Sequence, residues 1–212
     1  MSDKDPLIYL ITPGNLTAEN FESESPKTLQ TIRIAAENNI GLIQIREKNL
    51  PAKFVYELAL RARKVIRASG TRVLINERID IAIAANADGV HLTSTSLPVG
   101  IVRRLLPEKM MVGVSTHTFP EAKTAKENGA DLIVYGPVFK PFSKTFAERE
   151  KGLADLNEVS TALRPFPVIA LGGIGGGNIN LILASEAKGF ASISFLNDAD
   201  NLRKLGAGTP FK

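Results

Sequence analysis

The chain has 212 residues, a net charge of +4 at pH 7 and no cysteine. Its hydrophobic fraction of 44% is that of a globular protein with one sizeable core, and no apolar run is long enough to span a membrane. The absence of cysteine excludes disulfides and thiolate metal sites, and no secretory signal is evident, so we expect a cytoplasmic protein. The clearest basic cluster, within residues 61–67, has helical spacing and no aromatic platform, which favours a solvated helix face over an RNA-binding patch.

Short β-branched segments alternate with segments of helical periodicity along the whole chain. The predicted strands are Leu7–Thr12, Gly41–Arg46, Arg72–Asn76, Gly89–Leu92, Met111–Ser115, Leu132–Gly136, Val168–Gly172 and Ala191–Ser194. Helical spacing occurs between them near residues 28–38, 54–65, 78–86, 99–106, 119–128, 153–163 and 178–187. Strands separated by helices of this length pair in parallel through right-handed crossovers.

Eight such units predict one α/β domain over residues 1–212, a (β/α)8 TIM barrel. Segments 86–90 and 129–133 support a repeating unit, because each contains a helix end, an aspartate and a strand start. The alternative is a doubly wound open sheet, which would need a dinucleotide fingerprint. The glycine-rich stretch 172–178 does not match G-x-G-x-x-G, and it lies near the seventh strand instead of the first.

Polar residues gather at the C-terminal ends of the predicted strands, where barrel enzymes place their active sites. Alternation along residues 40–48 puts Gln44, Arg46 and Lys48 on one face of the second strand. The later strand ends and the loops after them supply the other candidates, which are Asn76, Glu77, His91, Ser115, His117, Ser143, Lys144, Gly173 and Ser194.

The candidates are suited to a negatively charged ligand. Arg46 can form a fork with phosphate oxygens, while Lys48 and Lys144 can act as point charges. Gly173 and Ser194 follow the seventh and eighth strands, where barrels commonly bind phosphate through backbone N–H groups. No metal-ligand motif such as H-E-x-x-H is present. The residues by themselves predict a barrel that binds a small, phosphorylated molecule.

Each candidate also has a purely structural explanation. Arg46 could pair with Glu47 or Glu77 in an internal salt bridge, and His91 could be a hydrogen-bonded barrel residue instead of a base. His117 could serve a helix N-cap, and the glycines after the seventh strand could form only a tight turn. Because all of these residues meet at one end of one barrel, a shared binding site is the favoured explanation.

Six segments resemble the thiamine phosphate synthase / thiazole tautomerase family, in the family's order and spacing. They are IQIREK (43–48), LINERIDIAIAANADGVHL (74–92), VGVSTHTFPEA (112–122), GADLIVYGPVF (129–139), PVIALGGI (167–174) and GFASISFL (189–196). The resemblance implies a (β/α)8 barrel of thiamine biosynthesis. A synthase of this family is a transferase that couples hydroxymethylpyrimidine diphosphate to thiazole phosphate and releases pyrophosphate with the help of Mg²⁺.

The resemblance also implies roles for the candidate residues. Arg46, Lys48, His117 and Lys144 would be catalytic, and Glu77 would bind Mg²⁺. The substrate-binding residues would be Gln44, Asn76, His91, Ser115, Ser143, Gly173 and Ser194, with the thiazole phosphate held at the last two. The implied partners are small phosphorylated substrates and a second copy of the chain in a homodimer, with no nucleic acid and no membrane.

Three positions depart from the family's synthase pattern. Glu77 and Ser96 stand where synthases have the two aspartates that bind Mg²⁺, and Pro141 stands where a threonine donates to pyrophosphate. Glu77 can still bind the metal, but Ser96 supplies no charge, so we expect a weakened Mg²⁺ site. All three changes fall on the metal and pyrophosphate half, while the thiazole phosphate half is intact.

A synthase is the leading hypothesis because the matched segments as a whole are most similar to synthases. Three alternatives stay open. A metal-independent thiazole tautomerase would use His117 as an acid or base. A non-catalytic protein would bind thiazole or thiamine phosphate without reaction. An unrelated phosphosugar barrel would explain the phosphate site but not the segments GVHL (89–92) and STHT (115–118).

Overall fold

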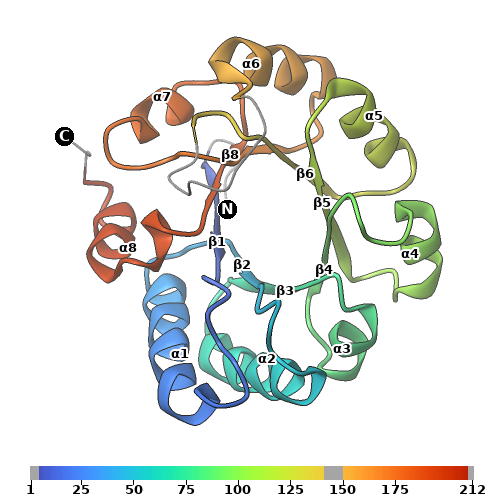
Figure 1. Ribbon diagram of the computed structural model, residues 1–212. Coiled ribbons are helices and arrows are strands. Elements are labelled where there is room, and N and C mark those ends of the chain that lie inside the picture. Colours follow the sequence, from blue (N-terminus) through green and yellow to red (C-terminus); the bar gives the residue numbers. More distant parts are fainter. Residues whose placement is uncertain (1–4, 141–149, 210–212) are drawn as a thin grey trace.

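The structure, a computed structural model, describes residues 5–140 and 150–209, in which eight parallel strands close into a barrel surrounded by helices (Figure 1). The prediction of a (β/α)8 barrel is confirmed. The strands are β1 (Leu7–Ile11), β2 (Leu42–Ile45), β3 (Arg72–Asn76), β4 (Gly89–Leu92), β5 (Met111–Thr116), β6 (Leu132–Tyr135), β7 (Val168–Ala170) and β8 (Gly189–Ser192). The helices are α1 (Phe21–Glu37), α2 (Ala52–Ile66), α3 (Ile79–Ala84), α4 (Val99–Leu105), α5 (Phe119–Glu127), α6 (Gly152–Leu163), α7 (Ile179–Leu183), the 3₁₀ helix η1 (Phe195–Asn197) and α8 (Ala199–Gly206).

Most predicted bounds differ from the observed ones by one or two residues, and two elements differ in a way that has a structural cause. The helix expected near 28–38 begins at Phe21 and contains Pro26 in its second turn. Phe21 packs against Phe54 of α2 with ring centroids 4.7 Å apart, and this contact accounts for the helical turns before the proline. The last strand ends at Ser192 instead of Ser194, because the chain turns into η1.

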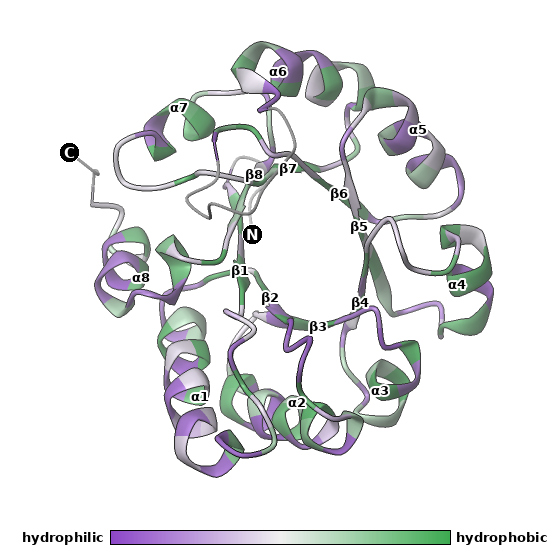
Figure 2. Cartoon of the chain, in the orientation of Figure 1, coloured by the Kyte–Doolittle hydropathy of each residue, from purple (hydrophilic) through white to green (hydrophobic). Residues whose placement is uncertain are grey.

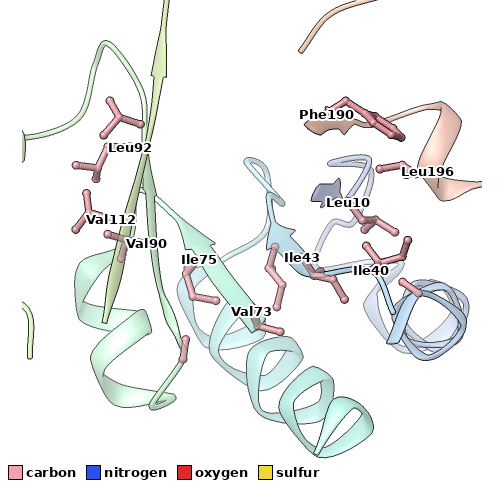
Figure 3. Close-up of a cluster of buried hydrophobic side chains, with 14 of the residues drawn as sticks. Leu10, Ile40, Ile43, Val73, Ile75, Val90, Leu92, Val112, Phe190 and Leu196 are labelled. Atoms are coloured by element: carbon pink, nitrogen blue, oxygen red, sulfur yellow. The ribbon is translucent and has the colours of Figure 1, made fainter. Parts of the chain in front are cut away.

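Apolar side chains form two layers, because alternate residues of each strand point to opposite sides of the sheet. Outward-facing residues such as Ile43, Val73 and Ile75 pack beneath the helices (Figure 3). Inward-facing residues fill the barrel with a second cluster, formed by Tyr9, Ile11, Leu42, Leu74, Leu132, Val134, Ile169 and Ala191. The strands are mainly hydrophobic in Figure 2, and the helices carry hydrophobic and hydrophilic residues on different sides. No helix of the described ranges is both long enough and apolar enough to cross a membrane.

Asp88 and Asp131, the aspartates of segments 86–90 and 129–133, have matching structural roles at the N-terminal end of the barrel. Asp88, just before β4, accepts a hydrogen bond from the backbone N–H of Val73 at 2.8 Å. Asp131, just before β6, accepts one from Val112 at 2.7 Å. Each carboxylate therefore ties the start of one strand to the preceding strand. Their role is structural, and the polar residues at the opposite end need a separate explanation.

Candidate active site

A chain of buried polar side chains crosses the barrel mouth from β1 to β5. The amide nitrogen of Gln44 donates to the hydroxyl of Tyr9 at 3.2 Å, and the same hydroxyl lies 3.3 Å from Nδ1 of His91. Nε2 of His91 lies 2.8 Å from Oγ of Ser115. The structure thus brings together three of the predicted residues, Gln44, His91 and Ser115, and joins them through a tyrosine that the sequence pattern did not single out.

Gly113 leaves space for the His91 ring within this chain. The two residues are register partners on β5 and β4, and a Cβ atom at Gly113 would lie 2.9 Å from Nδ1 of His91. Burial lowers the pKa of His91 to about 3, and the charge of Arg46 acts in the same direction. The imidazole is therefore neutral at pH 7. This geometry supports the explanation of His91 as a hydrogen-bonded barrel residue instead of a base.

Arg46 and Lys48 follow β2 but are positioned differently. The strand ends at Ile45, so the expected alternation does not extend to Lys48, which lies in an exposed turn. Arg46 is half-buried, and its backbone N–H donates to Oγ1 of Thr12 at 2.9 Å. This bond anchors the residue to the C-terminal end of the neighbouring strand β1.

The internal salt bridge considered for Arg46 is not formed with its neighbour in sequence. Glu47 is buried, and its carboxylate accepts hydrogen bonds from the backbone N–H groups of Leu16 at 3.0 Å and Gly14 at 3.3 Å. In residues 5–140 and 150–209, no carboxylate forms an ion pair with Arg46. The guanidinium is consequently available to an anionic ligand.

Glu77 lies within a group of hydrogen-bond donors at the ends of β3 and β4. Its Oε1 accepts from the hydroxyls of Thr93 at 2.6 Å, Ser96 at 3.0 Å and Thr95 at 3.2 Å. Its Oε2 accepts from the side-chain amide of Asn76 at 3.1 Å. The bond from Thr93 is the main cause that lowers the pKa of Glu77, against a smaller effect of burial, so the carboxylate is ionised at neutral pH.

Glu77 and Ser96, the two residues that differ from the synthase pattern at the expected metal site, are therefore adjacent in space. No cluster of three or more histidine, aspartate or glutamate side chains able to hold a metal ion occurs in the described part of the chain. Mg²⁺ usually takes one or two protein carboxylates and completes its shell with water and substrate phosphate. Glu77 fits the role of a single carboxylate ligand. Beside it, Oδ1 of Asn76 is buried without a hydrogen-bond partner, so it too could accept from a substrate or bind the metal.

The second half of the mouth is a cavity of about 300 Å³ at the ends of β5 to β8. Val134, Leu171 and Ile193 give it apolar walls. Its rim brings together four of the predicted residues, which are Ser115, His117, Gly173 and Ser194. Ser115 also belongs to the buried polar chain, so the two halves of the mouth meet at this residue.

Both the backbone conformation and the close packing of the loop after β7 require glycine at positions 172 and 173. Gly172 and Gly173 have left-handed backbones, with φ of +102° and +61°. A Cβ atom at Gly172 would lie 2.5 Å from Cβ of Pro137, and one at Gly173 would lie 2.5 Å from the carbonyl oxygen of Lys140. Asn178 fastens this loop by donating to the carbonyl oxygen of Gly173 at 2.8 Å. The loop is thus packed closely enough to present its backbone at a fixed place.

His117 lies on the cavity wall, and only its backbone serves the N-terminus of α5, while its side chain bonds elsewhere. Thr118 is the N-cap of α5, with its Oγ1 accepting from the N–H of Glu121 at 3.4 Å, while the Glu121 carboxylate accepts from the N–H of His117 at 2.7 Å. This pair resembles a capping box, except that Glu121 accepts from the residue before the N-cap. Nδ1 of His117 lies 2.7 Å from the carbonyl oxygen of Gly136, and because a carbonyl only accepts, this nitrogen carries a proton.

Two predicted residues, Ser143 and Lys144, lie outside the described residues. The sequence pattern missed Tyr9, and it grouped Thr93 and Thr95 with the polar residues after the fourth strand without giving them a role. Tyr9 stands in an apolar run and has the pattern of a core residue. Its inward-facing position on β1, close to the inward-facing Gln44, was the one available signal.

Comparison with known proteins agrees with the resemblance seen in the sequence. The family model described as thiamine monophosphate synthase matches residues 8–196. A thiamine-phosphate synthase of Caldicellulosiruptor bescii is 34% identical over 198 residues, covering 93% of this chain and 90% of the relative. One of Methanoculleus marisnigri is 38% identical over 162 residues, covering 76% of each chain.

A solved structure extends the similarity to the fold. Thiamine phosphate pyrophosphorylase from Pyrococcus furiosus superposes with a TM-score of 0.78 at 27% identity, covering 97% of this chain and 98% of the other. The family match spans all eight strands except the first residue of β1. The chain belongs to the thiamine monophosphate synthase family.

Proposed function

We propose that this protein is a thiamine-phosphate synthase, a transferase that couples hydroxymethylpyrimidine diphosphate to thiazole phosphate. The observation that carries the proposal is the division of the barrel mouth into two halves. One half, at β2 to β5, presents Arg46, Asn76 and the buried polar chain. The other is the cavity with Gly173 and Ser194 on its rim. Two phosphorylated substrates need two such sites, placed side by side.

The coupling reaction breaks the C–O bond between the pyrimidine methylene and the diphosphate. The electron pair of this bond leaves with the diphosphate, and the lone pair of the thiazole nitrogen forms the new C–N bond to the methylene. Arg46 and Lys48 would stabilise the charge that develops on the diphosphate, while Gln44 and Asn76 orient the pyrimidine. Glu77 would hold Mg²⁺, which when bound neutralises part of the diphosphate charge. The proposed contribution of the protein is therefore positioning and electrostatic stabilisation.

The proposal is tested by incubation with both synthase substrates, with and without Mg²⁺, and in parallel with the thiazole carboxylate phosphate used by tautomerases. We expect equal amounts of thiamine phosphate and pyrophosphate. Isomerisation of the thiazole without coupling would instead identify a tautomerase. Phosphate binding with neither reaction would identify a binding protein.

We further propose a homodimer located in the cytoplasm, which the family resemblance supports. Light scattering coupled to gel filtration measures the mass directly against that of the 22.9-kDa chain. A mass of a single chain at micromolar concentration would contradict the dimer without affecting the proposed reaction.

An oxyanion is expected to bind between the backbone N–H groups of Gly173 and Ser194. In crystals soaked with phosphate or sulfate, the ion should lie there, and inorganic phosphate should compete with thiazole phosphate for binding. Gly173→Ala should abolish this binding, because the new Cβ would displace the backbone of the loop. Gly177→Ala is the matched control, since a Cβ at Gly177 has no neighbour within 4 Å. Oxyanions bound only elsewhere would contradict the proposed thiazole phosphate site.

A further inference from the structure

The buried polar chain has one consistent direction of hydrogen bonding. The amide nitrogen of Gln44 can only donate, so the hydroxyl of Tyr9 accepts from it. Tyr9 is fully buried and has one proton of its own, and Nδ1 of His91 is the acceptor within the described residues that lies in reach of it, at 3.3 Å. With Nδ1 accepting, a neutral imidazole carries its proton on Nε2, which donates to Ser115 at 2.8 Å.

The direction of the hydrogen bonds in the buried polar chain determines whether Ser115 donates to a ligand or accepts from it. Its Oγ already accepts a proton from His91, so its own proton points to a different partner. Ser115 lies on the rim of the cavity, at the place where the two halves of the mouth meet, so its hydroxyl can face the pyrimidine half. A serine held in this way is a hydrogen-bond donor toward the substrate, whereas the opposite tautomer of His91 would use up the serine proton inside the protein.

We propose that Tyr9 is a positioning residue, which together with Gln44 holds His91 as the Nε2–H tautomer and so directs the Ser115 hydroxyl at an acceptor atom of the pyrimidine diphosphate. The identity of that ligand rests on the proposed function, while the tautomer does not. Two geometric observations support a dedicated arrangement. Gly113 leaves room for the ring where a Cβ would touch Nδ1, and the fully buried Tyr9 hydroxyl lies between Gln44 and His91.

The tautomer can be measured without any substrate. The chain has only two histidines, so His117→Gln leaves a single imidazole for ¹⁵N NMR. We expect the nitrogen shifts of an Nε2–H tautomer. Adding Tyr9→Phe removes the donor to Nδ1, and the shifts should move toward a mixture of the two tautomers. An Nδ1–H tautomer in the His117→Gln protein overturns the proposal. This single variant tests the tautomer of His91 even if the double variant does not fold. Shifts that do not change with Tyr9→Phe overturn it as well.

Substrate affinity separates positioning from a merely structural role. Tyr9→Phe should weaken binding of the pyrimidine diphosphate by roughly 10-fold, the effect expected when about a tenth of the molecules keep the Nε2–H tautomer, and should change thiazole phosphate binding less than about two-fold. Tyr135→Phe is the matched control, because it removes another buried hydroxyl, bonded to Asp155 at 2.6 Å, at the outer layer of the barrel. Equal losses for both ligands, or equal losses in both variants, would overturn the proposal. If the unmodified protein binds neither ligand, the proposed function fails while the tautomer result still stands.

Discussion

Replacing Arg46 by alanine is expected to slow coupling by roughly 100- to 1,000-fold, the range observed when one preorganised donor to a developing charge is lost. Arg46 is half-buried, is anchored to Thr12 through its backbone, and pairs with no carboxylate of the described residues. Its charge therefore does not serve an ion pair within the described residues, and we expect it to act on the ligand. Steady-state kinetics with both substrates measures the effect, and Lys48→Ala is expected to fall in the same range.

Two further variants make the result for Arg46 specific. Arg46→Lys keeps the charge but loses the fork geometry, so it should recover only part of the rate. Arg67→Ala removes an exposed arginine just after the C-terminal end of α2, away from the mouth, and should leave the rate unchanged. The melting temperature of Arg46→Ala should stay close to that of the unmodified protein. Activity within a few-fold of normal after Arg46→Ala would contradict the assignment of this half of the mouth to the diphosphate.

The barrel was predictable because its signals are local and repeated. The strands are short and largely apolar, all except β8 contain β-branched residues, and each is separated from the next by a segment with helical periodicity. The side of the barrel that carries the chemistry was also predictable, since the strand ends differ in polarity. The glycine loop was recognisable because Gly172 and Gly173 stand together close after the seventh strand. These features depend on neighbours in sequence.

The contacts inside the site depend on neighbours in space, and the sequence could not reveal them. Tyr9 and His91 are 82 residues apart, yet they meet because β1 and β4 face each other across the barrel. Glu47 looked like a partner for Arg46 but satisfies the backbone of the loop after β1 instead. The alternation that placed Lys48 beside Gln44 stops at Ile45, and only the backbone shows where a strand ends.

Coupling by this protein is expected to need more Mg²⁺ than coupling by a synthase with two metal-binding aspartates. Glu77 is the single carboxylate at the expected place, and Oγ of Ser96 lies 3.0 Å from its Oε1. A carboxylate at position 96 would thus reach the same cation. The double variant with Glu77→Asp and Ser96→Asp should lower the Mg²⁺ concentration at half-maximal rate by roughly 10-fold or more and raise the rate, since a neutral ligand is replaced by a charged one.

The structure favours both substitutions locally. Position 77 has a left-handed backbone with φ of +58°, which aspartate adopts more readily than glutamate. The backbone N–H of Thr93 donates to Oγ of Ser96 at 2.8 Å, and an aspartate oxygen can accept the same bond. Mg²⁺ should also raise the melting temperature of the double variant more than that of the unmodified protein, because two adjacent carboxylates repel each other until a cation binds between them. This readout does not depend on catalysis.

Ser94→Asp is the matched control for charge, because Ser94 is exposed in the same loop and makes no hydrogen bond to Glu77 in the described structure. It should leave the Mg²⁺ requirement unchanged, whereas Glu77→Ala should abolish both Mg²⁺ dependence and coupling. Saturation of the unmodified protein at ordinary Mg²⁺ concentrations, with no effect of Ser96→Asp, would show that another residue supplies the ligand. Proton exchange on a thiazole phosphate without coupling at any Mg²⁺ concentration would replace the synthase by a tautomerase, for which His117 on the cavity wall would be the acid or base.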